Sequence, residues 1–105
     1  MVDHVALVAV LEEQGRPLLV GGGRYIVTRP GYAEIAFGVV DAHQGLGIAS
    51  LLFKHLLAIA RTTGLQELQA DVLPGNTAML QVFRKLGNAV TITAGPDAVH
   101  VAVRC

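Results

Sequence analysis

The sequence predicts a mixed α/β fold (α+β) in which three strands precede two helices and a final hairpin, in the order βββαβαββ. Three observations lead to this prediction: continuous apolar segments near the N-terminus, short Gly- and Pro-containing turns between them, and a change to helical spacing after residue 45. The length of 105 residues suits a single domain, so we expect residues 1–105 to form one unit.

The first third of the chain has the pattern of an antiparallel meander. The apolar segments are separated by the short polar turns Glu12–Pro17 and Arg29–Gly31, and connections this short join antiparallel neighbours. The run Gly21–Gly23 predicts a bulge or bend within the second strand. The expected strands are 5–11, 18–28 and 32–40.

The next segments alternate helix and strand. Apolar residues recur at helical spacing over 46–63, and Gly64 follows as a terminator. A strand after this helix makes it a crossover connection, which favours a parallel pair of strands. Asn76 is a suitable N-cap for a second helix that ends at Gly87. The remaining strands are expected at 68–73, 89–93 and 98–103.

Composition limits the partners. Eight basic and eight acidic residues give zero net charge, so no long-range attraction to nucleic acids or anionic membranes is expected. No segment has the roughly 20 apolar residues of a membrane helix. Only 15% of residues are charged, which predicts that a partner, most simply a second copy, covers part of the surface. The single cysteine, Cys105, favours the reducing cytoplasm, and the four histidines show no metal-ligand spacing.

The segment Val39–Ala49 has the features of an anion-binding turn. A strand ends, a turn with Gly45 and Gly47 follows, and a long helix begins. The first N–H groups of a helix lack an intrahelical acceptor, the helix dipole is positive there, and glycines let an anion approach the backbone closely. Such a turn can hold a pyrophosphate without a basic side chain.

Glycines before a helix also serve tight packing alone, and that interpretation stays open. A Walker A loop is excluded because no Gly-Lys-Ser/Thr follows. A Rossmann fingerprint is disfavoured because meander strands precede the turn and a third glycine is missing.

Two motifs resemble those of one known family. Gln44-x-x-Gly47-x-Ala49 matches the Q/R-x-x-G-x-G/A signature of the GNAT (GCN5-related) N-acetyltransferases. Downstream, Asn76-x-x-Met79, Phe83 and Leu86-Gly87 are similar to the second block of that family. The sequences of residues 33–36, 41–45 and 72–76 are most similar to those of the acetyltransferase modules of bacterial protein-lysine acetyltransferases. Some of these modules are fused to acyl-CoA ligases.

The resemblance implies acetyl-CoA (coenzyme A) as the cofactor and assigns its contacts. Main-chain groups of Phe37 and Val39 would pair with the pantetheine arm, much as a peptide adds to a strand edge. Asn76 would hydrogen-bond the cofactor arm, cap the second helix, or do both. Main-chain amides of the turn would hold the pyrophosphate, namely those of Gln44, Gly45, Leu46, Gly47, Ile48 and Ala49.

The resemblance also implies transfer of an acetyl group to a primary amine, with protein lysine as the favoured acceptor. Direct attack would pass through a tetrahedral intermediate whose oxyanion meets a strand N–H near Val39. Glu34, within an apolar strand, is the candidate base, since partial burial would raise the pKa of its carboxyl. The alternative is that Glu34 is a solvent-facing strand residue. Two alternative functions stay open. One is a non-catalytic acyl-CoA-binding or assembly module, and the other is a structural domain with an empty turn.

Two features depart from the family pattern. Phe83 stands where many members carry a tyrosine that protonates the leaving thiolate, with Tyr25 and Tyr32 as substitutes only if the fold brings them near. The chain also begins at what resembles the second strand of the family, without the first strand and first two helices. An edge and apolar surface would then be exposed, and we expect a homodimer. Further candidates for phosphate contacts are His43 beside the turn, and Arg84 and Lys85 near the end of the second helix.

Overall fold

The computed structural model describes residues 3–86 and 89–105, and it confirms the predicted order of strands and helices. A short 3-10 helix, Asp41–His43, was not predicted. The expected end of the second helix at Gly87 lies outside the described residues. The elements are β1 (His4–Glu13), β2 (Arg16–Arg29), β3 (Tyr32–Val39), α1 (Ile48–Thr62), β4 (Glu67–Val72), α2 (Thr77–Leu86), β5 (Val90–Ala94) and β6 (Val99–Arg104).

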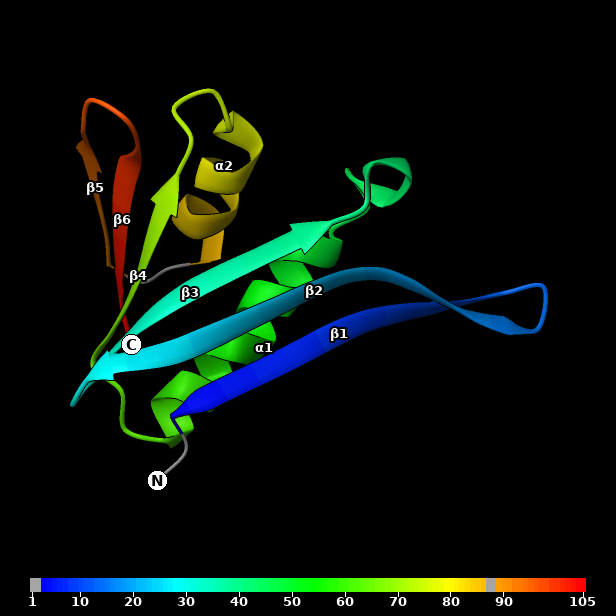
Figure 1. The fold of residues 1–105 in the computed structure, drawn as a ribbon, viewed down its shortest axis with the longest axis horizontal. Coiled ribbons are helices and arrows are strands. Elements are labelled where there is room, and N and C mark those ends of the chain that lie inside the picture. The colour runs from blue at the N-terminus through cyan, green and yellow to red at the C-terminus, as the bar shows by residue number, and fades with distance from the viewer. Residues whose placement is uncertain (1–2, 87–88) are drawn as a thin grey trace.

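The six strands form one mixed sheet in the order β1-β2-β3-β4-β6-β5 (Figure 1). β3 and β4, which α1 connects, are the parallel pair that the crossover predicted, and the other neighbours are antiparallel. The parallel pairing covers only three residue pairs and ends at Glu34 and Gln69. Beyond that point β3 and β4 diverge and leave a gap in the middle of the sheet, visible in Figure 1.

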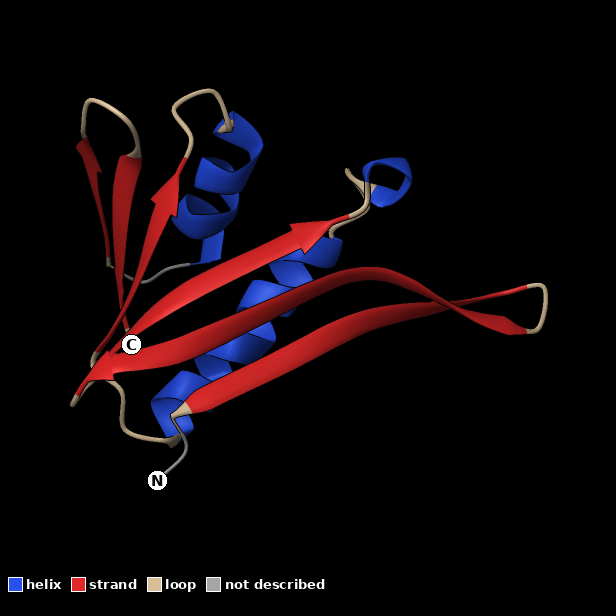
Figure 2. Ribbon diagram, viewed as in Figure 1, coloured by secondary structure: helices blue, strands red, loops and turns tan. Residues whose placement is uncertain are grey.

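One face of the sheet packs against the helices, and we call it the inner face (Figure 2). Alternate strand residues, such as Ala33 and Ile35 on β3, join one core with residues of both helices, such as Leu56 and Phe83. No helix of the described residues lies on the opposite, outer face, and Val8 on β1 is 67% exposed there. None of the described helices is long and apolar enough to cross a membrane.

The glycine run in β2 allows α1 to lie close to the sheet. The register of β1 and β2 shifts between Ala9 and Val10, beside Gly21, where a bulge was expected. A Cβ at Gly23 would lie 2.9 Å from the Leu56 side chain and 2.9 Å from the Phe37 Cβ. Glycine at this position therefore sets the distance between α1 and the sheet.

Candidate active site

The turn between β3 and α1 depends on two glycines in the left-handed region. Gly45 has φ +83° and Gly47 has φ +82°, values that other residues adopt only at a cost. A Cβ at either glycine would meet no atom within 4 Å. The glycines are therefore required by backbone conformation, and the space in front of the turn is open.

The start of α1 leaves several main-chain donors unused. The first helical bond runs from Leu51 N to Gly47 O (3.0 Å), and Gly47 provides no side-chain cap. Within the described parts of the chain, no amide from Gly45 to Ser50 donates to a main-chain or side-chain acceptor. These donors and the positive end of the helix dipole make the turn suitable for an anion.

Gln44 takes part in the turn differently from the other expected residues. Its main-chain N–H donates to Asp41 O (3.3 Å) and is already engaged within the 3-10 helix. Its side-chain Nε2 donates to Val39 O (3.1 Å) and to Asp41 Oδ1 (3.2 Å). Gln44 therefore ties the turn to the end of β3, a role that the sequence motif did not reveal.

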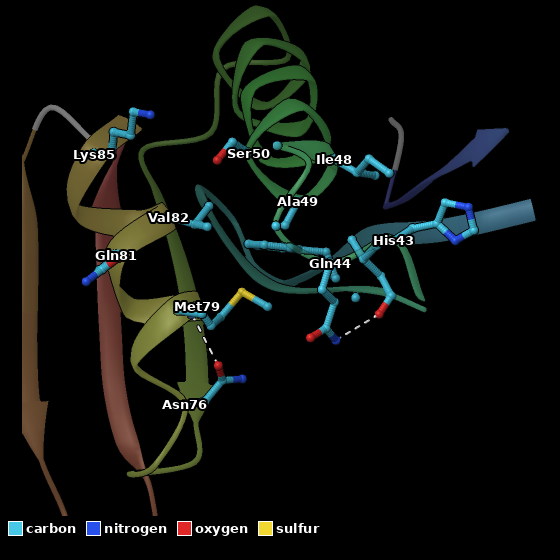
Figure 3. A pocket seen from close by; sticks show the side chains of 16 residues that line it. His43, Gln44, Ile48, Ala49, Ser50, Asn76, Met79, Gln81, Val82 and Lys85 are labelled. Atoms are coloured by element: carbon cyan, nitrogen blue, oxygen red, sulfur yellow. Dashed lines mark hydrogen bonds between the residues drawn. The ribbon is translucent and has the colours of Figure 1, made fainter. Parts of the chain in front are cut away.

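A cavity of about 460 Å³ lies between the turn and α2 (Figure 3). Eight of the nine residues expected to bind the cofactor line it. Leu46 is the exception, because its side chain is exposed outside the lining. The expected residues in the lining are Phe37, Val39, Gln44, Gly45, Gly47, Ile48, Ala49 and Asn76.

The main chain of β3 faces the gap at the same place. Val40 N donates to Val20 O (2.8 Å), which fixes which residues of β3 bond to β2. Bonded residues alternate along an antiparallel pair, so Phe37 and Val39 direct their main-chain groups away from β2, toward the gap. An extended ligand with amide groups can pair with β3 here.

The comparisons with known proteins agree with this geometry. Residues 2–87 match the model of a family described as the acetyltransferase (GNAT) family. The chain belongs to the GNAT acetyltransferase family. The mixed sheet with two helices is accordingly the GNAT fold that the sequence predicted.

Three relatives illustrate the likeness. Acetyltransferase PA5475 of Pseudomonas aeruginosa is 33% identical over 86 residues, which cover 81% of this chain and 46% of the relative. Acetyltransferase Pat of Mycolicibacterium smegmatis is 44% identical over 55 residues, covering 52% of this chain and 16% of Pat. The GNAT domain of S. lividans PAT superposes with a TM-score of 0.82 at 32% identity, covering 98% of this chain and 61% of that one. This GNAT chain thus spans less than half the length of either curated relative.

Asn76 has a structural role at the edge of the cavity. Its side-chain Oδ1 accepts a hydrogen bond from Met79 N (3.2 Å), which caps the start of α2 as expected. Asn76 also lines the cavity, and Figure 3 shows its Nδ2 on the other side of the amide from this bond. Capping therefore leaves the Nδ2 donor available for a second contact.

Phe83 lies in a cluster of three phenylalanines below the gap. Its ring centroid is 5.4 Å from that of Phe37 and 5.0 Å from that of Phe53, and the residue is only 1% exposed. The cluster joins β3, α1 and α2 through edge and offset contacts that stabilise aromatic pairs. Phe83 thus packs the core of this GNAT domain and has no proton to donate.

Glu34 differs from its expected surroundings. It lies on the outer face of β3 with an exposed side chain, outside the lining of the cavity. The partial burial expected for a base is not found, because the helices cover only the opposite face.

The two tyrosines also have structural roles. Tyr25 is fully buried, with its hydroxyl 3.5 Å from Thr63 Oγ1. The guanidinium of Arg29 lies 3.8 Å above the ring of Tyr32 at the turn after β2. Neither tyrosine lines the cavity, so neither stands in for the missing hydroxyl of Phe83.

Several polar residues near the site were not singled out as a group by the sequence. Of the candidates for phosphate contacts, His43 and Lys85 line the cavity, whereas Arg84 does not. Asp71 and His100 are in hydrogen-bonding contact on the outer face, and only the pairing of β4 with β6 could have shown this.

Burial raises the pKa of the Cys105 thiol, and a protonated thiol at neutral pH is a poor nucleophile.

Proposed function

We propose that this GNAT domain binds acetyl-CoA and transfers its acetyl group to a primary amine. The observation that carries the proposal is the set of unused amides at the start of α1, which border a cavity that opens onto the gap beside β3. A diphosphate fits these donors, and an amide-containing arm fits the main-chain groups of Phe37 and the N–H of Val39, since the Val39 carbonyl already accepts from Gln44 Nε2. Family membership supports the same assignment.

The residues present suit each part of the cofactor. The amides of 45–49 hold the diphosphate, β3 holds the pantetheine arm, and Asn76 Nδ2 adds a donor from α2. Bound acetyl-CoA supplies an activated acyl group: the amine nitrogen forms the new C–N bond, the C–S bond breaks, and coenzyme A leaves as the thiol. The chain itself positions the thioester at the gap, where the N–H of Val39 is directed.

Protein lysine is the acceptor class that we favour, on the sequence resemblance to modules of bacterial protein-lysine acetyltransferases. Glu34 remains the candidate base from that resemblance. The single cysteine is in keeping with a cytoplasmic protein.

A non-catalytic acyl-CoA-binding module is the second candidate. Two observations favour it: Phe83 offers no proton for the leaving thiolate, and Glu34 lies outside the lining of the cavity. This candidate predicts the same cofactor binding and no transfer.

Two measurements test the proposal. Isothermal titration should show binding of acetyl-CoA at micromolar to submillimolar concentrations, and a thiol assay should show release of coenzyme A with lysine peptides or small amines. Binding without amine-dependent release would favour the second candidate. Absence of binding at millimolar acetyl-CoA would exclude both functions.

We also propose a homodimer that covers the β1 edge. In the part of the chain that the structure describes, β1 pairs with β2 alone, and large apolar side chains are exposed along this hairpin: Val8, Val10, Leu11, Leu18 and Leu19. Light scattering should give twice the mass of one chain at micromolar concentration. The substitution Val8→Lys should shift the protein toward monomer, whereas Thr28→Lys, an exposed residue of β2, should not. A wild-type monomer would contradict the proposal.

A further inference from the structure

A second cavity lies in the gap between β3 and β4, with a volume of about 200 Å³. It shares Phe37, Asn76 and Met79 with the larger cavity, so the two adjoin. Its lining includes Phe83 from the inner side of the sheet and Asp71 from the outer side. The gap therefore connects the proposed cofactor cavity with the outer face.

Asp71 is the one carboxylate that lines either cavity among residues 3–86 and 89–105. The other ionisable side chains in the two linings are His43 and Lys85, both in the larger cavity. Asp71 is on β4 at the far side of the gap from β3, and its side chain is 63% exposed. An amine that reaches the gap from the outer face would meet this carboxylate.

His100 holds Asp71 from the neighbouring strand. The register of β4 and β6 places the two residues directly opposite one another, and His100 Nδ1 contacts Asp71 Oδ1. On its other side the imidazole packs against Gly95, where a Cβ would lie 3.2 Å from Nε2. The His100 side chain is 59% exposed, and its contact with Oδ1 leaves Oδ2 of Asp71 for another partner.

A polar hollow continues from Asp71 across the outer face. It has a volume of about 280 Å³, and its lining includes Gln69, Thr91 and Thr93 besides Asp71 and His100. These side chains donate and accept hydrogen bonds, so the hollow suits a polar chain that carries an amine rather than an apolar one. The acceptor and the cofactor would then approach the gap from opposite faces.

We propose that Asp71, positioned by His100, binds the ammonium of the acceptor and takes its proton. This inference rests on the proposed acetyl transfer. One N–H bond of the ammonium breaks and an O–H bond forms on Asp71, which frees the nitrogen lone pair for the acyl carbon. Asp71 later returns the proton to solvent. Asp71 touches the substrate in this scheme, and His100 acts through Asp71 as a positioning residue.

Glu34 is less well placed for this step. It is paired with Gln69 at the closed end of the gap, where β3 and β4 are still hydrogen-bonded, and it lines neither cavity. Asp71 lies where the strands have separated. If Asp71 is the base, Asp71→Asn should lose acetyl transfer and Glu34→Gln should keep it. If Glu34 is the base, the outcomes should be reversed.

The decisive comparison is between Asp71→Asn and Glu34→Gln, with Asp97→Asn as the control. Asp97 is an exposed carboxylate in the β5–β6 turn outside all three hollows. We expect D71N to lower kcat/KM for the amine by about 100-fold or more, as removal of a general base does. The Kd for acetyl-CoA should stay within about twofold, and D97N should match wild type. Transfer by D71N at the wild-type rate would overturn the inference.

His100 needs a separate measurement because its role is indirect. His100→Ala should reduce kcat/KM by about tenfold, and His100→Gln, which keeps an N–H donor, should recover part of it. Imidazole ¹⁵N shifts should show Nδ1 protonated in neutral His100, and D71N should change this tautomer. Equal losses in H100A and H100Q with no change in tautomer would count against the positioning role.

A binding experiment separates this inference from the proposed function. Nα-acetyl-lysine amide should shift amide signals of β4 and β6 in the CoA-loaded wild-type protein, and D71N should weaken this binding at least fivefold. If coenzyme A itself fails to bind, the proposed function is lost and this inference with it. If coenzyme A binds but the lysine analogue binds D71N and wild type equally, only the inference fails.

Discussion

The two helices of this protein begin at the same cavity but in different ways. At α2, Asn76 Oδ1 accepts the hydrogen bond of Met79 N, so the helix start is capped by its own side chain. At α1, Gly47 precedes the helix without a side-chain cap, and the amides from Gly45 to Ser50 have no protein acceptor among the described residues. Both starts face the space in Figure 3.

The difference separates a helix start that is capped by its own side chain from one that is suited to an anion. A side-chain cap contributes about 1 kcal/mol to helix stability, which α1 forgoes. In exchange α1 keeps its donors and dipole available to an anion, whereas α2 has one fewer free donor. The cavity is therefore asymmetric, and the diphosphate is expected at the α1 side.

Gly47→Val, at the uncapped start of α1, should have the largest effect on the affinity for acetyl-CoA. A β-branched residue at φ +82° costs about 1–2 kcal/mol in backbone strain. The strain should displace the neighbouring amides of the turn, which would then lose their hydrogen bonds to the charged oxygens of the diphosphate. Each such bond contributes about 1.5–3 kcal/mol, so the affinity for acetyl-CoA should fall about 100-fold or more. The measurement is isothermal titration.

Gly15→Val is the matched control for that prediction. Gly15 has φ +75° in the β1–β2 turn, and a Cβ there also meets nothing within 4 Å. Chemical denaturation should show a similar loss of stability in both variants, while only Gly47→Val loses acetyl-CoA affinity. Equal affinities for the two variants would mean that the turn does not hold the cofactor.

Asn76→Asp should separate the two roles of Asn76 at α2. Aspartate is an equally good N-cap, so the free energy of unfolding should stay near that of wild type. The substitution removes the Nδ2 donor and adds a negative charge beside the cavity, so acetyl-CoA affinity should fall by roughly tenfold. Asn76→Ala, in contrast, should lose about 1 kcal/mol of stability. Unchanged affinity in N76D would limit Asn76 to capping.

Gln44→Ala tests how the α1 start is held in place. The variant removes the hydrogen bonds to Val39 O and Asp41 Oδ1, both exposed. Such bonds contribute about 0.5–1.5 kcal/mol, so affinity should drop about threefold to fivefold through a looser turn. Gln69→Ala, which removes an exposed hydrogen bond to Glu67 outside the cofactor cavity, serves as the control for cofactor binding and should bind acetyl-CoA like wild type.

Lys85→Ala should have the smallest effect. Lys85 and Arg84 both lie in the last turn of α2, but only Lys85 lines the cavity. An exposed charge contributes up to about 1 kcal/mol, so affinity should fall twofold to fivefold in K85A and not in R84A. High salt should remove the difference. Loss of the difference with dephospho-CoA would identify the 3′-phosphate as the partner of Lys85.

The sequence was informative where local patterns decide structure. Helical spacing predicted 46–63, against Ile48–Thr62 in the structure, and the glycine motif predicted a turn before this helix, where the structure has Gly45 and Gly47 in the left-handed region. Eight of the nine residues predicted to contact the cofactor line the cavity, and they lie in two short motifs or beside them. These features depend on neighbours within a few residues of one another.

The remaining features depend on pairing between distant segments. Nothing local shows that β6 inserts between β4 and β5, or that β3 and β4 pair over three residues only. The exposure of Glu34 follows from both helices covering the other face. The contact between Asp71 and His100, which are 29 residues apart in sequence, requires the register of β4 and β6.

The gap also bears on aggregation. A strand edge with unpaired main-chain N–H and C=O groups can pair with a strand of another chain. In β3 such groups occur between β2 and β4, inside the sheet, where a foreign strand would have to enter between two flanking strands and above the phenylalanine cluster. A slender ligand can enter where a polypeptide cannot, so the protein keeps a reactive strand edge without offering it as a template for fibrils.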